Sequence, residues 1–117
     1  MRSESSYFDV EASGLEVLLG PTEAKLMEIA WRESELTVKQ TLFELGPDNT
    51  SAYTTVMTVL NRLSDKGLLE RHREGRNFIY RPCSSREAFI EERLGRIAAC
   101  LQRNFPDAWE RLRQTKP

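Results

Sequence analysis

The segment from Tyr53 to Gly67, YTTVMTVLNRLSDKG, contains residue types that can recognise another molecule. At about 100° per residue, a helix over this segment would separate an apolar side from a polar side. The apolar side would carry Tyr53, Val56, Met57, Val59, Leu60 and Leu63. The polar side would carry Thr54, Thr55, Thr58, Asn61, Arg62 and Asp65. Threonine, asparagine and arginine can contact base edges and flanking phosphates, so this pattern predicts a DNA-recognition helix. The alternative is that the threonines are merely tolerated at a surface.

A second group of basic side chains follows in a short loop. The β-prone runs Leu68–His72 and Asn77–Arg81 flank the loop Arg73–Arg76, which contains one glycine. This arrangement is typical of a β-hairpin with a charged tip. We predict that Arg73 and Arg76 contact DNA phosphates, the alternative being a solvated turn.

The preceding elements place these two groups in one fold. Helices are expected over about Pro21–Arg32, over Val38–Leu45 and from about Ala52, with Gly67 as a left-handed cap after the third helix. Three short helices followed by a hairpin predict a mainly α winged helix-turn-helix, in which the third helix enters the major groove.

The C-terminal third indicates a partner helix. A capping pattern at Ser84–Glu87 should start a long helix to about Gln102, and Phe105-Pro106 should separate it from a last helix over about Asp107–Gln114. Four apolar residues of the long helix recur at spacings of 4, 3 and 4, as in a coiled coil: Ile90, Leu94, Ile97 and Leu101. A second copy of the chain could cover this seam, and packing on the chain's own first helix is the alternative. The predicted dimerisation residues are Ile90, Leu94, Ile97, Leu101, Phe105 and Trp109.

Three regions are therefore expected: a flexible N-terminal tail (1–14), a winged-helix DNA-binding domain (15–82) and a helical dimerisation region (83–117). The formal net charge is only −1, yet the stretch 61–82 has six basic against three acidic residues. Phosphate binding depends on such a local field. With no signal-peptide pattern and no apolar run long enough for membrane insertion, we expect a cytoplasmic protein.

The composition disfavours catalysis and metal binding. The chain has a single histidine, His72, and two cysteines, Cys83 and Cys100, and it lacks a phosphate-binding glycine loop. We therefore expect neither an enzyme nor a cofactor. The main rival function is a winged helix that serves as a protein–protein interaction module or adaptor. Such a module should expose an apolar or acidic third-helix face, which the threonine-rich face does not resemble.

The motifs LGPTEAKLMEIAW, TV, YTTVMTVLNRLSDKGLLER and FIYRP resemble the penicillinase-repressor family of bacterial transcriptional regulators, with its BlaI, MecI and CopY relatives. The resemblance covers about Leu19 to Pro82. It implies a homodimeric winged-helix repressor on operators with TACA/TGTA-type inverted repeats. It also implies DNA contacts by Thr54, Thr55, Thr58 and Arg62, and by the loop Arg73–Arg76.

Two features bear on the signal to which such a repressor would respond. Copper-responsive members carry paired Cys-x-Cys motifs, which this chain lacks. In β-lactam-responsive members, a membrane sensor system leads to cleavage of an Asn–Phe bond in the dimerisation region. Asn104-Phe105 is such a dipeptide, although Pro106 departs from the pattern. A helix break with Phe105 packed in the dimer core is the alternative.

Overall fold

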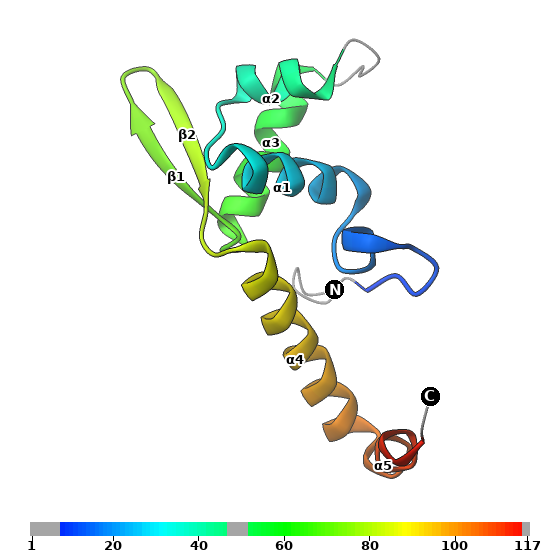
Figure 1. Cartoon of the computed structure of the whole chain (residues 1–117). Coiled ribbons are helices and arrows are strands. Elements are labelled where there is room, and N and C mark those ends of the chain that lie inside the picture. The colour runs from blue at the N-terminus through cyan, green and yellow to red at the C-terminus, as the bar shows by residue number, and fades with distance from the viewer. Residues whose placement is uncertain (1–7, 47–51, 116–117) are drawn as a thin grey trace. The chain divides into compact units, whose positions relative to one another are not determined.

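The computed structural model describes residues 8–46 and 52–115, which form a mainly helical protein with one β-hairpin. The chain divides into two compact units, Met1–Ser85 and Arg86–Pro117. Figure 1 shows the helices and the hairpin of the first unit. The first unit contains the 3₁₀ turn η2 (Gly14–Val17), α1 (Pro21–Glu33), α2 (Val38–Leu45), α3 (Tyr53–Asp65), β1 (Leu69–Glu74) and β2 (Asn77–Pro82). The second contains α4 (Arg86–Asn104) and α5 (Pro106–Gln114). The predicted fold class is confirmed.

Local sequence signals explain where the helices of the first unit begin and end. Pro21 occupies the first turn of α1, where a missing N–H leaves no hydrogen bond unmade. The Thr37 hydroxyl accepts a hydrogen bond from the Gln40 backbone N–H at 3.0 Å and so caps α2. After α3, Gly67 has a φ of 86°, which is the left-handed conformation expected at this position.

The predicted N-terminal tail lies partly on residues 1–7, which are outside the described residues. From Phe8 onward the backbone takes part in the fold: the N–H of Asp9 donates to the Val17 carbonyl at 2.9 Å. Leu15 in the adjoining turn η2 is buried. This part of the chain is therefore attached to the turn that precedes α1.

One apolar core joins the three helices of the first unit to the base of the hairpin. Side chains at helical spacing on α1 and α3 supply about half of it, because each helix buries one face. The most deeply buried large apolar side chains are Leu19, Leu26, Met27, Leu36, Val56, Leu60, Leu63, Leu69 and Tyr80.

The hairpin is antiparallel, with Arg71 opposite Tyr80 and Arg73 opposite Phe78. Leu36, in the connection from α1 to α2, extends this pairing on the β2 side. Its N–H donates to the Tyr80 carbonyl and its carbonyl accepts from the Tyr80 N–H, both at 2.8 Å. Tyr80 therefore holds β2 in two ways: its backbone pairs with Leu36, and its ring is buried in the core.

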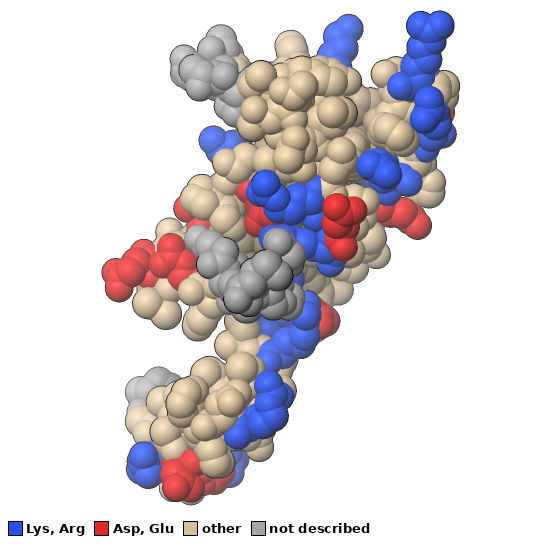
Figure 2. Space-filling model, turned by 180° about the vertical axis from the view of Figure 1, so that it is seen from behind, with Lys and Arg blue, Asp and Glu red and all other residues tan. Residues whose placement is uncertain are grey.

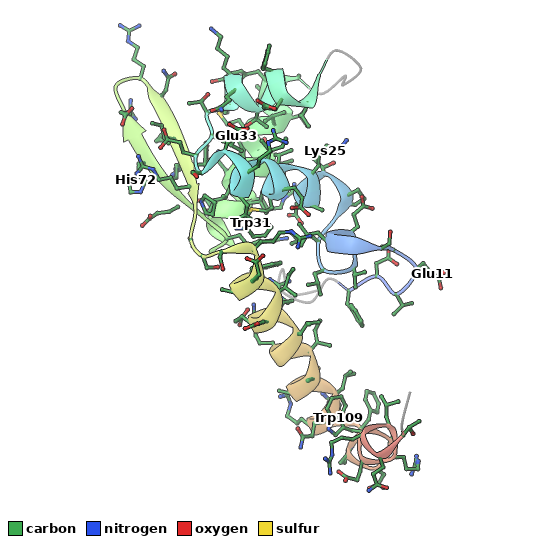
Figure 3. The ribbon with its side chains drawn as sticks, viewed as in Figure 1. Glu11, Lys25, Trp31, Glu33, His72 and Trp109 are labelled. Atoms are coloured by element: carbon green, nitrogen blue, oxygen red, sulfur yellow. The ribbon has the colours of Figure 1, made fainter. Side chains whose placement is uncertain are left out.

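Trp31 joins the end of α1 to the segment that follows β2. Its indole Nε1–H donates to the Ser84 carbonyl at 2.9 Å. Figure 3 shows Trp31 near the base of the hairpin and His72 on the hairpin itself. In the described ranges, no helix is long and apolar enough to cross a bilayer.

Candidate nucleic-acid interface

Helix α3 has the two faces that its sequence predicts. Val56, Val59, Leu60 and Leu63 are buried. The opposite face is open: Thr54, Thr55, Thr58, Arg62 and Asp65 are exposed, and Asn61 is half-buried. One correction concerns Tyr53, which was expected on the apolar side but is 51% exposed. It is the first residue of the helix, and its side chain lies at the edge of the core.

The hydroxyl of Thr58 is already engaged as a donor. Its Oγ1 donates to the Thr54 backbone carbonyl at 2.8 Å. A threonine hydroxyl has one proton and two lone pairs, so Thr58 can present acceptor capacity and a methyl group. That combination suits a base edge with an amino group or a thymine methyl.

The end of α3 carries two cations beside one buried carboxylate. Lys66 Nζ lies 2.8 Å from Glu23 Oε2, and Arg62 Nη1 lies 4.0 Å from the same oxygen. Glu23 also accepts a hydrogen bond from the Gly20 N–H at the start of α1, at 3.4 Å. Lys66 is therefore committed to the fold, whereas the Arg62 side chain is 48% exposed and extends from the polar face.

These cations border a hollow on the polar face of α3. Thr58, Asn61, Arg62, Asp65 and Lys66 line it. The hollow combines hydroxyl, amide and guanidinium groups with one carboxylate, so it has several hydrogen-bonding groups within a small area.

Asn61 links α3 to the hairpin. Its Oδ1 accepts from the Tyr80 hydroxyl at 2.6 Å and from Arg71 Nη1 at 2.9 Å. Burial raises the pKa of the Tyr80 phenol, with Arg71 acting in the opposite direction. The phenol therefore keeps its proton at neutral pH and acts as the donor. The sequence predicted Asn61 only as a DNA contact. The structure shows that its side chain also joins α3 to the hairpin through Tyr80 and Arg71.

The hairpin tip differs in detail from the predicted loop. Only Gly75 and Arg76 form the turn, with Gly75 at a φ of 64°, and Arg73 belongs to strand β1. The Arg73 guanidinium lies 5.5 Å from the centroid of the Phe78 ring, and its Nε donates to the Gly75 carbonyl at 3.3 Å. Arg73 is thus oriented by the hairpin, whereas Arg76 is exposed at its tip.

Arg71 is a basic residue that was not among the predicted contacts. Its guanidinium lies 4.7 Å from the centroid of Phe78, so Arg71 and Arg73 share one aromatic ring. Residues two apart on a strand lie on the same face, and this alternation was available from the sequence once β1 was placed. Figure 2 shows Lys and Arg side chains at the end of the hairpin farthest from the helices.

In the second unit, the residues predicted for dimerisation have incompletely covered side chains. Leu94, Leu101 and Phe105 are exposed, and Ile90, Ile97 and Trp109 are half-buried. Asn104 ends α4 and Phe105 lies in the break before α5. The Asn104 side-chain amide donates to the Cys100 carbonyl at 2.8 Å. Cleavage at this dipeptide stays a prediction.

Three helices followed by a hairpin, with the polar face of the third helix open, define a winged helix-turn-helix protein. Solved structures agree with this class. The solution structure of the DNA-binding domain of the repressor BlaI aligns with a TM-score of 0.53 and 27% identity, covering 74% of this chain and 90% of that chain. The Bacillus licheniformis BlaI monomer in complex with the blaP half-operator aligns with a TM-score of 0.50 and 32% identity, covering 59% of this chain and 84% of that chain.

The chain belongs to the penicillinase repressor family, whose sequence profile matches residues 19–112. It is 33% identical over 73 residues to the penicillinase repressor of Bacillus licheniformis and 38% identical over 73 residues to the transcriptional regulator BlaI of Mycobacterium tuberculosis. Each match covers 62% of this chain and spans about half of the relative, 57% and 53% respectively.

Proposed function

We propose that this protein is a sequence-specific DNA-binding transcriptional repressor that acts as a homodimer. The observation that carries the proposal is the open polar face of α3 beside a hairpin with Arg73 and Arg76 at its tip and Arg71 farther along β1. Thr54, Thr55 and Thr58 would contact base edges, and Arg62 would contact a base or an adjacent phosphate. Arg73 and Arg76 would bind phosphates flanking the major groove.

The second unit supports the dimeric part of the proposal. Apolar side chains on α4, on α5 and in the break between them leave a surface that a second copy could cover, including Leu94 at 51% exposure and Phe105 at 60%. A two-fold dimer would place two copies of α3 in successive major grooves. Its operator should then be an inverted repeat with half-sites about one or two helical turns apart. TACA/TGTA-type repeats are the first candidates, from the family resemblance.

The test is binding to a duplex with this inverted repeat and to a scrambled duplex of the same composition, at several salt concentrations. We expect a clear preference for the repeat and a steep fall of affinity with salt, because each neutralised phosphate contributes about −0.9 to the log–log slope. Equal affinity for both duplexes would contradict sequence-specific binding. Absence of salt-dependent binding would favour the protein-interaction alternative.

A further inference from the structure

The amide of Asn61 has a fixed orientation. Arg71 can only donate hydrogen bonds, so the Asn61 atom 2.9 Å from Arg71 Nη1 is the carbonyl oxygen. The Tyr80 hydroxyl, 2.6 Å from the same oxygen, has its proton available to donate. Both contacts come from the hairpin, which therefore sets the rotation of an amide on α3.

The same two contacts use the whole acceptor capacity of Asn61. An amide oxygen has two lone pairs, and Tyr80 and Arg71 occupy both. The amide nitrogen carries two N–H donors. Asn61 is half-buried and lines the hollow beside Thr58 and Arg62, the two neighbours proposed to contact DNA. Toward a ligand in that hollow, the Asn61 side chain can therefore only donate hydrogen bonds, through its amide N–H groups.

We infer that Asn61 is a donor-only specificity residue, which selects a hydrogen-bond acceptor on the DNA. The inference rests on the proposed function and specifies it. Suitable acceptors are guanine N7 or O6, adenine N7, thymine O4 or a phosphate oxygen. The adenine 6-amino and cytosine 4-amino groups are excluded as partners. Asn61 therefore cannot form the paired hydrogen bonds to adenine N6 and N7 that asparagine commonly makes, because that pairing needs a free amide oxygen.

A double-mutant cycle between protein and DNA tests this inference. Wild-type protein and Asn61→Ala are titrated against operator duplexes that each lack one group. Analogues remove purine N7 (7-deazapurines) and guanine O6 (2-aminopurine), weaken thymine O4 (4-thiothymine) or remove one phosphate charge (methylphosphonate). Purine in place of each adenine removes the 6-amino donor. Base analogues and methylphosphonates separate a base edge from a phosphate as the source of the acceptor.

We expect one acceptor change to weaken wild-type binding about fivefold, the cost of one neutral hydrogen bond, and to weaken Asn61→Ala binding less than twofold. Removal of any adenine 6-amino group should affect both proteins equally. Loss of a 6-amino group that weakens only the wild type would overturn the inference, since the amide oxygen would then be accepting. Acceptor changes that all affect both proteins equally would also overturn it.

Asn61→Asp is the companion variant if loss of the internal hydrogen bonds unfolds Asn61→Ala. Aspartate keeps an oxygen for Tyr80 and Arg71 but has no donor. Its added charge acts alike on the unmodified duplex and on the duplexes with uncharged base analogues, so it cancels in those cycles, whereas a methylphosphonate removes a phosphate charge and is compared only with Asn61→Ala. We expect the base acceptor whose removal weakens the wild type to have little effect on Asn61→Asp, as for Asn61→Ala. A wild-type protein that does not prefer the unmodified operator over a scrambled duplex would instead refute the proposed function, before any Asn61 comparison is made.

Discussion

Lys66 Nζ lies 2.8 Å from Glu23 Oε2, and only 8% and 9% of these two side chains are exposed. The ion pair joins the end of α3 to the first turn of α1, across 43 positions of sequence. Glu23 also accepts from the Gly20 N–H, so its carboxylate has two kinds of partner. Helix α3 is therefore held at its C-terminal end by a charge–charge contact that water barely reaches.

Replacing Glu23 should destabilise the first unit. In Glu23→Gln the buried Lys66 ammonium would lose its carboxylate, and breaking a buried ion pair from one side costs about 3 kcal/mol. Urea unfolding followed by circular dichroism would measure the change. Glu44→Gln is the matched control, because Glu44 pairs at 2.6 Å with Arg32, which is largely exposed. We expect that control to leave the unfolding midpoint nearly unchanged. Equal effects of the two variants would contradict a stabilising role for the buried pair.

Arg62→Ala should weaken operator binding severely while the fold stays intact. Arg62 is 48% exposed and 4.0 Å from Glu23, so the core loses little when it is truncated. Loss of a base or phosphate contact should reduce affinity about 10- to 100-fold, measurable by fluorescence anisotropy with a labelled operator. Asp65→Asn, a change at the same hollow, should increase affinity because it removes a like charge near the phosphates. Wild-type affinity in Arg62→Ala would reject the assignment of the polar face.

Removing Arg73 and Arg76 together should weaken operator and random DNA almost equally. Phosphate contacts carry no sequence information directly, and each lost contact should make the log–log salt slope shallower by about 1. Arg81→Ala is a control on the same hairpin, since Arg81 Nε pairs with Glu35 at 3.0 Å. That control should bind nearly as the wild type does. Loss of affinity for the operator alone in the double variant would point to base reading by the hairpin.

The parts of the interface that follow local rules could be predicted from sequence. Helical periodicity identified the buried and exposed faces of α3, and the helix expected over Val38–Leu45 has the bounds of α2. The polar face of α3 was visible because its residues are neighbours on one helix. Arg73 was assigned to a loop because a four-residue connection was expected. The turn has only two residues, Gly75 and Arg76, so β1 continues through the charged residues as far as Glu74.

The remaining features depend on contacts between elements distant in sequence. Asn61 meets Tyr80, 19 positions away, only because the hairpin packs beside α3. Glu23 meets Lys66 only because α1 crosses near the end of α3. Tyr53 was assigned to the core because periodicity indicates a face but not the point at which the core ends. Such contacts depend on how the elements pack against one another, and the spacing of residues within one element does not reveal that packing.

The apolar residues of α4 should hold the proposed dimer together, and Leu94→Asp should therefore give monomers. Leu94 is 51% exposed in the single chain, and a carboxylate there would have to be buried without a partner in a dimer. Sedimentation velocity over a range of concentrations would measure the change. Ala99→Asp is the matched control, because Ala99 lies on α4 outside the 4-3-4 apolar pattern and is exposed. It adds the same charge to the same helix, so it should stay dimeric. If Leu94→Asp also stayed dimeric, the interface would lie elsewhere, and the two copies of α3 would need another scaffold to reach an inverted repeat.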